Sequence, residues 1–105
     1  MKHGLYKVEF RTPGGNGAGV LFVQDGKFRG GDGGFYYVGT YTETGDHITG
    51  SVLVKRHSAG VNGLVPDNTT INLSGAAKGD AATLDGTIAG RPGVKFHAHI
   101  QRLAD

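Results

Sequence analysis

Apolar and polar side chains alternate at every second residue through most of this chain. In residues 5–11, Tyr6, Val8 and Phe10 alternate with charged residues, so one face of the segment is apolar and the other is charged. The same period recurs at 18–24, 35–42, 47–56, 69–74, 82–89 and 94–103. No window has the three- and four-residue spacing of apolar side chains that marks an amphipathic helix. At most a single helical turn is expected near residues 58–68. The chain is therefore predicted to be all-β.

Short turn sequences separate these segments. They are Asp-Gly at 25–26, "TGD" at 44–46, "KGD" at 78–80 and "RPG" at 91–93. Asp-Gly tolerates the positive φ angles of two-residue hairpin turns, and Gly or Pro interrupts the other strands. A further short strand at 27–30, between the first turn and the next glycine cluster, brings the predicted number of strands to eight.

The glycine cluster "GGDGG" at 30–34 is open to two interpretations. A phosphate-binding loop needs a helix directly after the glycines, because the first helical turn supplies the amides that hold phosphate. The strand-like "FYYVGTYT" follows instead. The cluster is therefore predicted to be a turn or bulge in which Asp32 caps backbone amides.

Eight short strands joined mostly by hairpins favour a meander that closes on itself, because closure leaves no strand edge unpaired. Gly39, Gly50 and Gly86 lie inside strand segments, where a curved sheet needs them. We expect residues 1–105 to form one domain, an eight-stranded antiparallel up-and-down β-barrel, and keep a β-sandwich as the alternative.

Composition narrows the functional classes. Lys and Arg number 11 against 9 Asp and Glu, and they are scattered rather than gathered in an arm, which argues against direct nucleic-acid binding. There is no cysteine, so disulfides and thiolate sites are excluded. The amino-terminal residues lack the apolar core of a signal peptide, and no segment has the roughly 20 apolar residues of a membrane helix. We expect a cytoplasmic bacterial protein that does not act at a membrane.

His97 and His99 are the most suggestive polar pair. They are two residues apart on a strand and therefore share a face. A metal site would need a third ligand, for which His57 and Asp85 are the candidates. Two histidines that face solvent are commoner than a two-histidine metal site, so no metal or cofactor is predicted. The serines at 51, 58 and 74 lack the context of a catalytic nucleophile, and we predict no enzymatic activity.

Aromatic residues allow two further interpretations. "GGFYYVGTY" is similar to strands that stack RNA bases, but that fold needs two helices; an OB-like barrel exposing Tyr36 and Tyr41 would be the remaining nucleic-acid platform. A second set of aromatic residues either lines a ligand cavity or simply fills the barrel, and filling is the simpler interpretation. The set consists of Tyr6, Phe10, Phe22, Phe28, Phe35, Tyr37 and Phe96.

Apolar residues also occupy both faces of segments 20–23 and 52–54. A strand that is apolar on its outer face needs cover there, most simply from a second subunit. The sequence therefore predicts a homodimer.

Taken in order, several of these features resemble the negative regulators of type III secretion, the GrlR-like family. The shared features are Gly4 and Tyr6 in the first strand, Gly17 and Gly19 in the second, Asp25-Gly26 at the first hairpin, "GGD" at 30–32 and the stretch from Gly39 to Thr44. The likeness covers about the first 57 residues, and beyond them it extends only to the strand pattern.

The resemblance implies a small lipocalin-like barrel that dimerises and binds a transcriptional activator protein. The acidic partner-binding loop of the family matches positions 43–46, where Glu43 and Asp46 keep half of the family's carboxylates. We therefore expect a non-enzymatic regulatory protein with Glu43 and Asp46 as its partner-binding residues. The alternative is a carrier or sensor of a small apolar or lipid-like ligand, held in the barrel or at a dimer interface.

Overall fold

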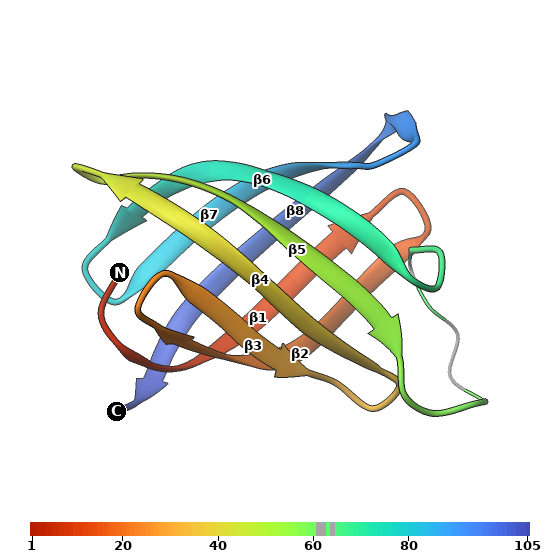
Figure 1. Cartoon of the computed structure of the whole chain (residues 1–105), viewed down its shortest axis with the longest axis horizontal. Coiled ribbons are helices and arrows are strands. Elements are labelled where there is room, and N and C mark those ends of the chain that lie inside the picture. The colour runs from red at the N-terminus through yellow and green to blue at the C-terminus, as the bar shows by residue number, and fades with distance from the viewer. Residues whose placement is uncertain (61–62, 64) are drawn as a thin grey trace.

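The computed structural model describes residues 1–60, 63 and 65–105, and its architecture is a closed β-barrel (Figure 1). The strands follow one another around the barrel in chain order, and β8 pairs antiparallel with β1 to close it. They are β1 (Gly4–Thr12), β2 (Gly15–Gln24), β3 (Lys27–Gly31), β4 (Phe35–Thr44), β5 (His47–Arg56), β6 (Thr69–Lys78), β7 (Ala81–Ile88) and β8 (Arg91–Ala104). The predicted eight-stranded up-and-down barrel is confirmed, and the sandwich alternative is wrong. No helix among the described residues is long and apolar enough to cross a membrane.

Hairpin turns follow the predicted chemistry in three of four places. Asp25 and Gly26 both have positive φ, 52° and 74°, as a two-residue hairpin turn of type I′ requires. The prediction of a turn at 91–93 is wrong, because the chain turns one step earlier, at Ala89 and Gly90. Residues 91–93 open β8, where the pairing jumps from Thr87↔Lys95 to Ile88↔Arg91. This irregularity accommodates Pro92, which has no amide proton for a regular ladder.

Glycines inside strands let neighbouring backbones come close. A Cβ atom added at Gly39 would lie 2.2 Å from the carbonyl oxygen of Ser51, and one added at Gly75 would lie 1.9 Å from that of Thr83. No side chain fits at either distance. Of the three in-strand glycines predicted from the sequence, Gly39 shows this close approach most clearly; Gly75 was not among them.

The two ends of the barrel differ in how they are filled. The terminal end carries the turns at 25–26, 45–46 and 79–80 and both chain termini, on the left of Figure 1; the loop end carries the other four connections. At the terminal end Tyr41 stacks on Phe28 with ring centroids 4.6 Å apart, and Met1 packs against the core. Fully buried Tyr6, Val23 and Ile48 belong to this packed half. The free space inside the barrel therefore lies towards the loop end.

Candidate ligand-binding cavity

A cavity of about 330 Å³ lies inside the barrel towards the loop end. All eight strands contribute to its wall, which is built mainly from hydrocarbon side chains: Val8, Phe10, Leu21, Phe28, Phe35, Val52, Val54, Ile71, Leu73, Leu84, Phe96, Ala98 and Ile100. Its volume falls at the lower end of the range for small-molecule sites, and its apolar wall is typical of them.

Small residues at inward-facing positions explain the space. Gly17 and Ala98 form part of the wall where larger side chains would fill the interior. Further towards the terminal end the inward positions of the same two strands hold the larger Val23 and Ile100, which are fully buried, and Ile100 borders the cavity on that side. The interpretation that aromatic residues simply fill the barrel is correct only for the terminal half.

Five of the seven aromatic residues considered from the sequence line this cavity: Phe10, Phe28, Phe35, Tyr37 and Phe96. Phe10 stacks on Phe96 with centroids 5.8 Å apart and meets Tyr37 edge to face at 6.4 Å. Phe22 does not belong to the set, because it lies on the outer face against the ring of His3. The strand alternation gives the reason, since Leu21 and Val23 take the inward positions of β2.

Asp32 organises the polar part of the cavity wall. One carboxylate oxygen accepts hydrogen bonds from the amides of Gly34 and Phe35, each at 3.0 Å, and the other accepts one from the Tyr37 hydroxyl. The predicted amide-capping role of Asp32 is confirmed. Burial raises the pKa of the Tyr37 phenol, and its hydrogen bond to the Asp32 carboxylate raises it further, so Tyr37 stays a neutral donor.

Two described residues between β5 and β6, Gly63 and Val65, belong to the cavity wall. Arg56, at the end of β5, holds both carboxylate oxygens of Asp67 at 2.9 Å, which ties the two ends of the connection together. The Arg56 guanidinium also lies 4.6 Å from the centre of the Phe35 ring. The segment is thus attached to the strand that carries the cavity's aromatic wall.

His57 lies at the same end and not beside the other two candidate histidines. Its amide donates to the carbonyl of Gly34 at 2.9 Å, and its Nε2 lies 2.9 Å from the carbonyl oxygen of Asp32. This places His57 against the β3–β4 turn, so it does not serve as the third ligand considered for His97 and His99.

His97 and His99 share the outer face of β8, as predicted. His97 Nδ1 lies 2.7 Å from the carboxylate of Asp85, and His99 Nδ1 lies 3.4 Å from the Thr83 hydroxyl. Among the described residues, no group of three metal-ligating side chains comes together. Across the sheet Asp85 lies between Ser74 and His97, which is not the Ser–His–Asp order of a catalytic triad.

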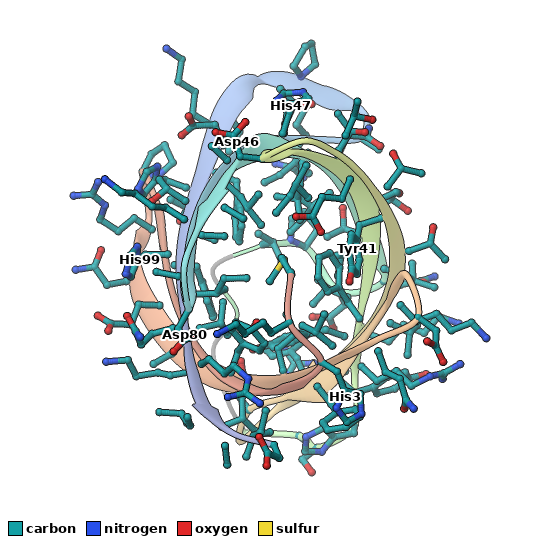
Figure 2. All side chains as sticks on the ribbon, turned by 90° about the vertical axis from the view of Figure 1, so that its left-hand side faces the viewer. His3, Tyr41, Asp46, His47, Asp80 and His99 are labelled. Carbon is teal, nitrogen blue, oxygen red and sulfur yellow. The ribbon has the colours of Figure 1, made fainter. Side chains whose placement is uncertain are left out.

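Tyr36 and Tyr41 lie on opposite faces of β4. Tyr36 is 39% exposed on the outside, whereas Tyr41 points into the barrel and stacks on Phe28 (Figure 2). Their odd and even positions make this unavoidable in a strand. The idea of an exposed two-tyrosine platform for nucleic-acid bases is therefore wrong.

Glu43 and Asp46 lie at the terminal end but in different surroundings. The Glu43 carboxylate is paired with the Met1 ammonium and is 29% exposed. Asp46 lies in the exposed β4–β5 turn, on the rim of the barrel in Figure 2. Their role in partner binding stays a prediction.

No family model matches the chain, and no curated protein matches it. The resemblance to secretion regulators therefore remains an interpretation of the sequence, and the structure bears out its coarse part, the closed eight-stranded antiparallel barrel.

Proposed function

We propose that this protein carries or senses a small apolar molecule that binds in the cavity at the loop end. The observation that carries the proposal is a closed barrel with an interior space of about 330 Å³ and a wall of hydrocarbon side chains. Water gains few hydrogen bonds in such a space, whereas an apolar ligand removes its own surface and that of the wall from water.

Cavity volume sets the size of the ligand. A cavity of about 150 Å³ accepts benzene, so 330 Å³ corresponds by proportion to about 13 non-hydrogen atoms. At about 0.5 kcal/mol per atom such a ligand binds with about 6.5 kcal/mol, a dissociation constant of about 20 μM. A medium-length alkyl chain or a two-ring aromatic has suitable dimensions.

Decanol is a suitable neutral probe, and its binding can be followed by the NMR shifts of valine, leucine and isoleucine methyl groups. Decanol should shift the wall residues Val52, Ile71 and Leu84 and leave Ile48, at the packed end, unchanged. The variant Ala98→Leu fills part of the space and should weaken binding about tenfold. Ala104→Leu makes the same change at an exposed site on the same strand and should bind like the parent. Unchanged wall methyl groups, or equal binding by both variants, would contradict the proposal.

A second candidate function is the binding of a protein partner, a transcriptional activator on the family resemblance. The exposed hairpin turns of the terminal end each carry an aspartate, Asp25, Asp46 and Asp80, and Asp80 is paired with Lys2 at 3.3 Å. These three aspartates, termed the acidic rim although Lys27 and Lys78 flank two of the turns, suit a basic partner, because charge complementarity governs the rate and choice of association.

Capture from the native host tests this second function. The parent protein should recover a basic regulator, and Asp25→Asn with Asp46→Asn should lose it. Asp85→Asn on the side of the barrel is the matched control and should retain the partner. Equal recovery by all three proteins, or recovery of nothing specific, would argue against the acidic rim.

A further inference from the structure

The charge of the cavity wall specifies the chemistry of the ligand beyond its size. Only three lining side chains among the described residues carry polar groups, namely Asn16, Asp32 and Tyr37, and no Lys, Arg or His lines the space. The single formal charge in the wall is therefore negative. A ligand whose polar end is a carboxylate or phosphate would meet a like charge and no cation there.

Asp32 has capacity for one further hydrogen bond. A carboxylate offers about four acceptor positions, and three are taken by the two amides and the Tyr37 hydroxyl. Tyr37 donates its only proton to Asp32, so its oxygen also faces a ligand as an acceptor. Both groups thus call for a hydrogen-bond donor at the polar end of the ligand.

Nearby cations do not neutralise this preference. Arg56 is bound to Asp67 through two hydrogen bonds of 2.9 Å, and the ring of His57 is directed to the main-chain carbonyl of Asp32 rather than to its carboxylate. The Arg56 guanidinium instead lies 4.6 Å from the centre of the Phe35 ring, where it occupies one ring face.

Building on the proposed function, we infer that the cavity selects an apolar molecule that ends in a hydrogen-bond donor, an ammonium group most strongly and a hydroxyl next, and that it rejects fatty carboxylates. The apolar part occupies the barrel interior, and the donor lies against Asp32 and Tyr37. A ligand carboxylate would place a second negative charge beside the partly buried Asp32 carboxylate, and this repulsion is the basis of the discrimination.

Three probes of equal chain length test the inference in the methyl NMR assay: decylammonium, decanol and decanoate. Decylammonium should bind about tenfold more tightly than decanol, and decanoate about tenfold more weakly. Asp32→Asn keeps an oxygen for the two turn amides and removes the charge, so the three probes should then bind within about threefold of one another. Asp85→Asn removes a charge from the outer face of the barrel, away from the cavity wall, and should keep the full order.

Tyr37→Phe gives a second variant that retains the carboxylate. It frees one acceptor position on Asp32, so the preference for decylammonium should persist or increase. Decanol binding together with equal or tighter decanoate binding would overturn the inference and leave the proposed function intact. Failure of all three probes to bind the parent protein would instead remove the proposed function. A preference lost in Asp85→Asn and kept in Asp32→Asn would also overturn the inference.

Discussion

Replacement of Asp32 is the most direct test of how the "GGDGG" turn supports the cavity. Asp32→Ala removes the acceptor for the amides of Gly34 and Phe35 and for the Tyr37 hydroxyl. Gly34 and Phe35 are buried, and each of their amides loses a hydrogen bond with a net value of about 0.75 kcal/mol, whereas the Tyr37 phenol loses a charge-assisted bond worth about 1.5 kcal/mol. The free energy of unfolding should therefore fall by about 3 kcal/mol, which is a decrease in Tm of about 15 °C for a domain of this size.

Asp32→Asn separates the geometric contribution from the charge. Its amide oxygen can still accept from both turn amides, and we expect a loss of only about 1 kcal/mol. A double-mutant cycle of Asp32→Ala with Tyr37→Phe should give a coupling energy of about 1.5 kcal/mol. Urea unfolding followed by circular dichroism measures all of these values. Equal destabilisation by the Ala and Asn variants, or a coupling energy near zero, would refute the assigned hydrogen-bond network.

Three further predictions concern pH, packing and assembly. The pKa of Tyr37 is raised in the folded state, so above pH of about 10 the unfolded chain loses a proton that the folded chain keeps. The free energy of unfolding should therefore fall there by about 1.4 kcal/mol per pH unit for this residue. In urea titrations at alkaline pH, Tyr37→Phe should show a correspondingly smaller dependence of the free energy of unfolding on pH. Gly75→Ala should lower the free energy of unfolding by more than about 2 kcal/mol because its Cβ would meet the Thr83 carbonyl, whereas Gly33→Ala, with open space around it, should change it by less than about 0.5 kcal/mol in the same assay. Val20 is 46% exposed on the outer face near Phe22. If this face forms the predicted homodimer, Val20→Lys should shift sedimentation velocity profiles from dimer towards monomer. A parent protein that sediments as a monomer would contradict the predicted homodimer.

The sequence allowed the fold to be predicted because a two-residue period leaves little freedom. An inward residue at Tyr6 forces Val8 inward too, and the same logic runs through each strand. Where the local signal was ambiguous, the prediction was wrong. "RPG" has the composition of a turn, yet the positive φ of 80° at Gly90 places the reversal before it and leaves Pro92 in an irregular strand start.

The cavity could not be predicted in the same way. Its existence depends on how the volumes of inward side chains from eight strands add up at one level of the barrel, which requires the register between strands. Gly17 and Ala98 were visible as small residues, but only the closed barrel puts them around a common space. Likewise, the glycines around Asp32 predicted that it caps backbone amides. Its contact with the Tyr37 hydroxyl arises because β4 runs back past the turn.

The two proposed functions occupy opposite ends of the barrel, and thermodynamic linkage decides whether they form one mechanism. Phe28 lines the cavity and stacks on Tyr41, which belongs to the terminal end, so one aromatic pair connects the ligand space with the acidic rim. For a sensor, ligand and partner must change each other's affinity by the same factor, because the coupling free energy is shared. A carrier needs no such coupling. Partner affinity measured with and without saturating decylammonium distinguishes the two. In a sensor the ratio of the two affinities differs clearly from one, and Tyr41→Ala brings it closer to one. In a carrier the ratio is one in both the parent protein and Tyr41→Ala.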